Sequence, residues 1–143
     1  MSPKEEVELL MNDGMVFAEL MLSKHGEFHP FSRALDVGGK IQNVDAFDGR
    51  EFPPGKEALE FLESGLRVKV LKDKDLAVSI FSNVTVRSSE TNESIDAIQV
   101  GLEHSSGYAV NVYFPYEITP EGPVFGELFA NSRSPAVFVG GAS

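Results

Sequence analysis

The spacing of apolar residues predicts two amphipathic helices. Ser2-Pro3-Lys4-Glu5 has the form of a capping box with proline at the first helical position. A helix is therefore expected over about residues 3–24, with Gly14 as a point of close approach on its apolar face. Helical spacing returns later in the chain and predicts a second helix over about residues 56–70.

Alternation of apolar and polar residues predicts strands elsewhere. A hairpin with strands at about residues 27–37 and 40–47 is expected around Gly38-Gly39, because both glycines can adopt positive φ. A last short strand is expected at about residues 124–129. Three further alternating runs lie between the second helix and that last strand: Leu76 to Val86, Ile98 to Leu102, and Tyr108 to Tyr116.

These elements predict the order α-ββ-α-ββββ in one domain that spans residues 1–143. Strands joined by short turns pair antiparallel, so we predict an α+β fold with a single antiparallel sheet of about five or six strands. We expect both helices to pack on one face of this sheet. The clearest alternation predicts buried side chains at Val100, Leu102, Val110 and Val112.

Composition narrows the classes of function. The chain has 143 residues, no cysteine, 12 Lys plus Arg against 22 Asp plus Glu, and a net charge of −10. Without cysteine it forms no disulfide framework, thiolate zinc site or iron–sulfur cluster. Its negative charge disfavours nucleic acid as a partner. The acidic N-terminus and the absence of a long apolar stretch predict a cytoplasmic protein with no membrane partner.

Basic charge is concentrated at the end of the second predicted helix. Arg67, Lys69, Lys72 and Lys74 supply four of the 12 basic residues within eight positions. Cations complement the negative end of the helix dipole, which favours a solvated helix end. A local docking patch on an otherwise acidic protein is the alternative.

Two pairs of residues are candidates for acid–base chemistry. Glu27 and His29 would share one face of a strand, and His104 follows Glu103 near the end of another. Adjacent strand residues point to opposite faces, so Glu103 and His104 should not meet. We expect no metal site and no cofactor, because the chain lacks spaced ligand motifs, a phosphate loop and a nucleophile elbow.

Apolar and aromatic residues outside the helices suggest association. Phe81, Tyr113 and Phe125 lie on the less apolar side of their strands or between faces, and the tail is apolar from Ala136 to Val139. An exposed aromatic patch on a sheet commonly marks an interface, whereas the same side chains can also lie under a helix. A homodimer is expected, and another protein is a further candidate partner.

The chain resembles a group of small bacterial proteins of uncharacterised activity over roughly residues 5–130. The residues that carry the resemblance are Gly26 to Phe31, Asp96 to His104, Phe114-Pro115-Tyr116 and Phe125 to Phe129. It implies an intact domain and a bacterial source. In the order of its first elements the chain also looks like roadblock/profilin-like domains, and in size and charge it is similar to type III secretion chaperones.

Three hypotheses follow. The first is a non-catalytic protein-interaction or regulatory module. The second is a small-ligand-binding protein that uses space between the sheet and the helices. The third is an enzyme with a histidine–carboxylate site around Glu27, His29, Glu103 and His104.

Overall fold

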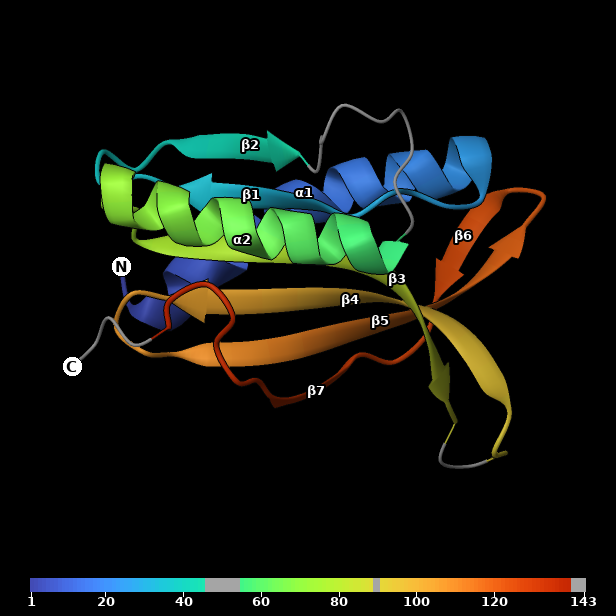
Figure 1. Cartoon of the computed structure of the whole chain (residues 1–143). Helices are drawn as coiled ribbons and strands as arrows, with labels where there is room; N and C mark the ends of the chain where they lie inside the picture. Colours follow the sequence, from blue (N-terminus) through green and yellow to red (C-terminus); the bar gives the residue numbers. More distant parts are fainter. Residues whose placement is uncertain (46–54, 89–90, 140–143) are drawn as a thin grey trace.

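A computed structural model describes residues 1–45, 55–88 and 91–139, which contain two helices and seven strands (Figure 1). In chain order these are α1 (Pro3–His25), β1 (Phe31–Leu35), β2 (Ile41–Asp45), α2 (Gly55–Asp73), β3 (Ala77–Arg87), β4 (Ser94–His104), β5 (Ala109–Thr119), β6 (Gly122–Phe125) and β7 (Phe129–Ser132). The α+β class and the predicted order of the first elements are confirmed.

The strands form one open sheet in which every paired neighbour is antiparallel. The order across the sheet is β2-β1-β3-β4-β5-β6, and β7 also pairs with β5. The prediction of one last strand at residues 124–129 is therefore wrong. This segment contains the end of β6, a break in which the Gly126 N–H donates to the Pro115 carbonyl at 2.8 Å, and the start of β7.

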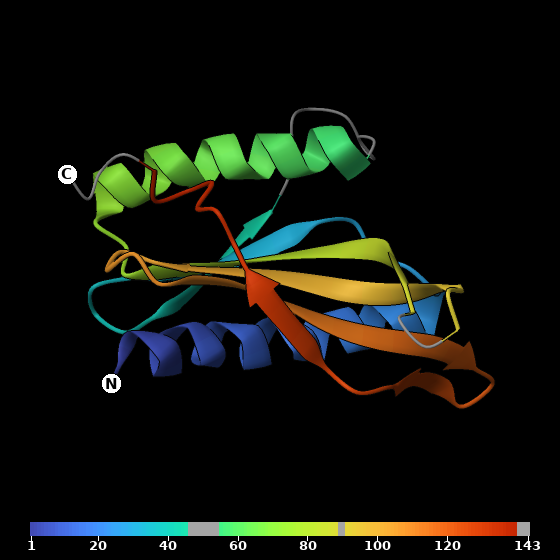
Figure 2. The same cartoon turned by 90° about the horizontal axis from the view of Figure 1, so that it is seen from below.

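The two helices cover opposite faces of the sheet (Figure 2). Leu35, Phe81 and Val100 pack with the buried side of α1, whereas Val78 and Ile80 pack with Leu66 and Val70 of α2. The expectation that both helices share one face is wrong. The burial of β1 agrees with this arrangement: all five of its residues are buried, because one helix covers each side of the strand.

The start and end of α1 follow from local chemistry. The Ser2 hydroxyl accepts from the Glu5 backbone N–H at 3.2 Å, and the Glu5 carboxylate accepts from the Ser2 N–H at 3.2 Å, which confirms the capping box. The helix ends at Gly26, whose φ of 76° places it in the left-handed region that glycine adopts without steric cost.

Gly14 seats α1 on the sheet. A Cβ atom added at this position would collide with the Phe81 ring of β3, so only a hydrogen fits between helix and ring. Phe81 is fully buried and stacks on Phe31 with ring centroids 4.6 Å apart. The close approach expected at Gly14 is confirmed, and Phe81 lies under a helix rather than in an exposed aromatic patch.

The first hairpin is shorter than predicted: its strands span residues 31–35 and 41–45 instead of 27–37 and 40–47. Residues 46 and 47 lie outside the described ranges. Pro30 has no N–H to donate to a ladder, and the Phe28 N–H donates instead to the Asn83 side chain at 3.1 Å. Pairing with β3 therefore starts at Phe31, opposite Phe81.

The predicted burial of side chains is confirmed in β4, whereas the side chains of β5 are less buried than predicted. Val100 and Leu102 are 0% and 1% exposed, whereas Val110 and Val112 are half-buried at the margin of the α1 cluster. The cause is the position of α1, which packs on β1, β3, β4 and β6 and leaves β5 less covered. No helix in the described part of the chain is long and apolar enough to cross a membrane.

Candidate functional site

Glu27 and His29 lie at one end of the sheet and His104 at the other. Glu27 and His29 are exposed in the segment before β1, whereas His104 is level with Ala77 and, across β3, with Leu35 at the end of β1. Four strand positions separate Phe31 from Leu35, which is about 13 Å at the usual rise per residue. The structure therefore does not bring the two pairs of candidate residues into one cleft.

The end of the sheet near Glu27 contains a half-buried phenol, Tyr116, rather than a histidine pair. The Tyr116 hydroxyl accepts from the Asn83 side-chain amide at 2.6 Å. Burial raises the pKa of Tyr116, and the nearby carboxylates of Asp96 and Glu27 raise it further against the opposing effect of that hydrogen bond.

His104 joins the sheet to α1. Its Nε2 lies 2.9 Å from Glu6 Oε1, and its Nδ1 accepts from the Ser106 backbone N–H at 3.0 Å. Because Nδ1 accepts, the neutral ring carries its proton on Nε2 and donates it to Glu6. Both ring nitrogens are thus engaged within the chain. The partner carboxylate comes from α1, which strand spacing alone does not indicate.

Glu103 is a buried anchor for the C-terminal segment. Its side chain is 1% exposed, and it points to the α2 side of the sheet, away from His104. Oε1 accepts from the N–H groups of Val137 and Phe138 at 2.8 and 3.0 Å, and Oε2 accepts from the Ala136 N–H and from Arg133 Nε, both at 2.9 Å. Four hydrogen bonds fill the acceptor capacity of this carboxylate.

Arg133, which the sequence analysis did not identify as a candidate, holds the Glu103 carboxylate together with other residues. Its Nη1 donates to the Asn111 side chain at 3.0 Å, and its Nη2 lies 3.6 Å from a Glu63 carboxylate oxygen of α2. The guanidinium packs directly over Gly101, where an added Cβ would lie 2.6 Å from Nη1. A glycine in an otherwise regular strand pattern was the available signal for such a close contact.

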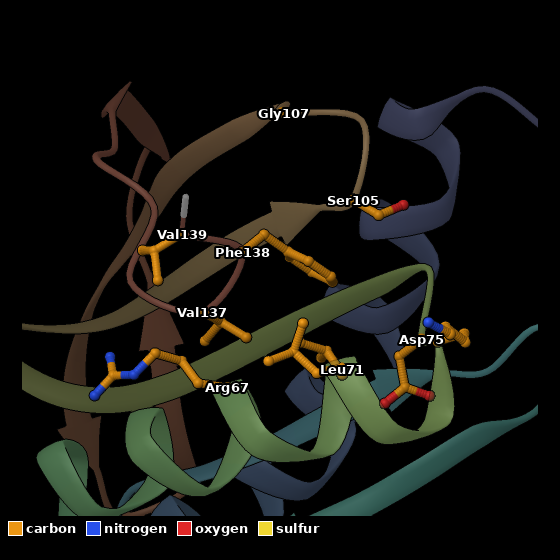
Figure 3. A pocket seen from close by; sticks show the side chains of 10 residues that line it. Arg67, Leu71, Asp75, Ser105, Gly107, Val137, Phe138 and Val139 are labelled. Carbon is orange, nitrogen blue, oxygen red and sulfur yellow. The ribbon is translucent and has the colours of Figure 1, made fainter. Parts of the chain in front are cut away.

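The anchored segment forms one wall of a pocket of about 380 Å³ between α2 and the turn that joins β4 to β5 (Figure 3). Figure 3 shows Leu71, Val137 and Phe138 grouped near its centre, with Arg67 on one side and Asp75 on the other. The lining is mainly apolar. Among the described residues, no cluster of three or more His, Asp or Glu side chains is placed to hold a metal ion.

Two of the four basic residues near the end of α2, Arg67 and Lys69, form contacts within the chain. Arg67 Nη1 donates to the Ala136 carbonyl at 2.7 Å. Lys69 Nζ lies 2.7 Å from the buried Asp75 and 3.1 Å from Asp73. Burial lowers the pKa of Lys69, but the hydrogen bonds and charges of these two carboxylates outweigh it and raise the pKa overall. Lys72 and Lys74 are exposed and remain available at the surface.

The outward face of α1 carries an aliphatic stripe that sequence reasoning missed. Leu9, Val16 and Leu20 are 38%, 72% and 46% exposed, and they lie on the side of the helix opposite the buried Val7 and Ala18. Their spacing of seven and four residues was the available signal, since it places them on one side of a helix. We call these three residues the α1 stripe.

The outward face of α2 has a similar feature. Phe61, Val68 and Leu71 are 44%, 67% and 72% exposed at spacings of seven and three residues. We call these three residues the α2 stripe. α2 lies on the far side of the sheet from α1, so the two stripes face away from each other within one chain (Figure 2).

Comparisons with protein-family models, with curated proteins and with solved structures gave no match to this chain. The candidate sites therefore rest on the geometry of the chain itself. The two that this geometry supports are the pocket beside α2 and the pair of outward helix stripes.

Proposed function

We propose that the protein is a non-catalytic interaction module that acts through self-association. The observation that carries this proposal is the α1 stripe, three large aliphatic side chains aligned on the outer face of a helix. Isolated exposed aliphatic residues are common on protein surfaces, but an aligned row is typical of a helix that packs against another element.

The hydrogen bonds of Glu103 and His104 support a structural role for these two of the four acid–base candidates. Glu103 and both ring nitrogens of His104 are occupied by contacts that hold the C-terminal segment and α1 in place. A general acid or base needs a free hydrogen-bonding position toward a substrate. We therefore assign these two residues to stability.

The apolar tail, which suggested a homodimer from the sequence, is used within the chain. Val137 is 3% exposed and packs with Leu66 and Val70 of α2. The α1 stripe replaces the tail as the reason to expect association. The bacterial source, the cytoplasmic location and the homodimer all remain predictions.

Sedimentation velocity at micromolar concentrations tests this proposal. We expect a species heavier than the 15.6 kDa chain that becomes more abundant as concentration rises. Val16→Glu should abolish it, because it places a charge in the middle of the α1 stripe. Val37→Glu is the matched control, since Val37 is 67% exposed in the hairpin turn, compared with 72% for Val16. A wild-type protein that stays monomeric at every concentration would contradict the proposal.

A second candidate function is the binding of an amphipathic anion in the pocket. Its apolar lining suits an alkyl chain, and Arg67 and Lys74 supply positive charge at the lining. The Asp75 carboxylate also lies at the lining, where its charge is balanced by Lys69 at 2.7 Å. Isothermal titration with decanoate, with decanol as the uncharged comparison, tests this candidate. Lys74→Gln should weaken decanoate binding selectively, whereas Lys40→Gln should not. Equal absence of heat with both ligands would exclude it.

A further inference from the structure

We infer that copies of this chain associate head to tail, with the α1 stripe of one copy packed on the α2 stripe of the next. This inference rests on the proposed self-association and names the surface that receives the α1 stripe. Four features of the described residues bear on it. They are the spacing of the two stripes, the charges beside them, the apolar area that the contact buries, and the directions of the two helices.

The two stripes match in spacing. Leu9 and Val16 are seven residues apart, as are Phe61 and Val68. Seven residues of helix span about 10.5 Å, so both pairs can meet in one helix-on-helix contact. Asp13 in α1 and Ser64 in α2 lie between the apolar positions of their stripes, which places polar residues at similar points of both surfaces.

The charges beside the stripes are complementary. α1 carries five acidic residues against two lysines, and Glu5, Glu6 and Glu8 lie in its first two turns. The last turns of α2 carry Arg67 and the exposed Lys72, whereas Lys69 between them is paired with Asp73 and Asp75 of its own chain. Two α1 helices packed on each other would bring acidic residues together. Packing α1 antiparallel on α2 instead places acidic turns opposite basic ones.

Energetics also favour a contact in which both surfaces are apolar. Burial of an aliphatic side chain stabilises a contact in proportion to the apolar area removed from water, so residues that are already partly buried contribute less. Association itself has an opposing cost, because each copy loses translational and rotational freedom. The α1 stripe therefore gains most from a partner surface that is itself apolar and exposed, which the α2 stripe provides.

The directions of the helices determine the form of the assembly. Figures 1 and 2 show α1 and α2 running in opposite directions along the same axis of the molecule. If α1 of one copy packs antiparallel on α2 of the next, the two copies have nearly the same orientation. Such a contact does not close after two copies, so the assembly extends as an open row, which replaces the homodimer expected from the sequence.

Mixing two variants tests this inference. Val16→Glu blocks the α1 stripe and leaves the α2 stripe intact, and Val68→Glu does the reverse. Both positions are largely exposed, and unchanged thermal midpoints will show that each variant folds. We expect each variant alone to be monomeric. An equimolar mixture should form a complex of twice the 15.6 kDa chain mass and grow no further.

Other outcomes would overturn the inference in distinguishable ways. If Val68→Glu still associates while Val16→Glu does not, the contact is a symmetric one between α1 helices, and only the head-to-tail arrangement fails. If both variants are monomeric and their mixture is also monomeric, the two stripes do not bind each other. If the wild-type protein never associates, the proposed function fails as well.

Discussion

At the scale of single residues, the most informative side chain is a carboxylate that serves stability. Glu103 is almost completely buried and ionisable, a combination that often marks a functional site. Here four hydrogen bonds and the Arg133 guanidinium compensate the cost of its burial. Burial alone therefore does not identify a catalytic group, and its hydrogen-bond partners decide the assignment.

Replacing Glu103 tests this assignment. Glu103→Gln should lower the free energy of unfolding by about 3 kcal/mol or more, because an amide nitrogen would face N–H donors and Arg133 would lose its buried counter-charge. Chemical denaturation measures the change. Glu117→Gln, on the exposed part of β5, should alter stability little. Equal effects of the two substitutions would show that Glu103 does not anchor the C-terminal segment.

The hairpin turn predicts a dependence on pH. The backbone N–H of Lys40, together with the Gln42 side chain and the Gly38 N–H, lowers the pKa of Asp36. The stability that ionised Asp36 contributes is therefore present above its ordinary pKa of about 3.9, and it is lost as pH falls through the lower value of the folded state.

Asp36→Asn tests this dependence. At neutral pH the variant should unfold at a lower temperature than the wild-type protein. The difference should narrow in acid, because Asp36 then becomes neutral in the wild-type protein as well. Thermal unfolding followed by circular dichroism measures both conditions. A difference that stays constant from neutral pH into acid would contradict the role of the carboxylate.

At the scale of elements, sequence patterns predicted those features that depend on residues close together in the chain. The capping box predicted the start of α1, and alternation predicted the three long strands β3, β4 and β5, but not the division of the last segment into β6 and β7. The layer arrangement was not accessible, because β3 is buried on both faces from Ala77 to Ser82 and such a run does not indicate which helix covers which side. The contacts of Glu6 with His104 and of Arg133 with Glu103 join residues far apart in the sequence, which spacing does not reveal.

Two glycines in helices offer a matched comparison. Gly14→Ala should destabilise the protein although alanine favours helix formation, because its methyl group would displace the Phe81 ring. Gly65→Ala in α2 meets no atom within 4 Å and should stabilise the protein by up to about 1 kcal/mol. Urea denaturation of both variants measures the signs. Stabilisation by Gly14→Ala would show that α1 does not rest on Phe81 as described.

At the scale of the whole molecule, charge and topology act together. A net charge of −10 disfavours contact between copies, yet the last turns of α2 and the residue that follows the helix hold four of the 12 basic residues. An acidic helix on one side of the sheet and a basic helix end on the other give each copy two unlike surfaces.

The absence of cysteine allows the central claim to be tested directly. In a Val16→Cys or Val68→Cys variant, the introduced thiol is the only one in the chain. The two variants, one of them labelled with heavy nitrogen, are mixed and treated with a short bismaleimide, and mass spectrometry identifies the linked pairs. Head-to-tail packing predicts that links between position 16 and position 68 dominate. Links mainly between two copies of position 16, or no more linkage than a Val37→Cys control gives, would contradict it.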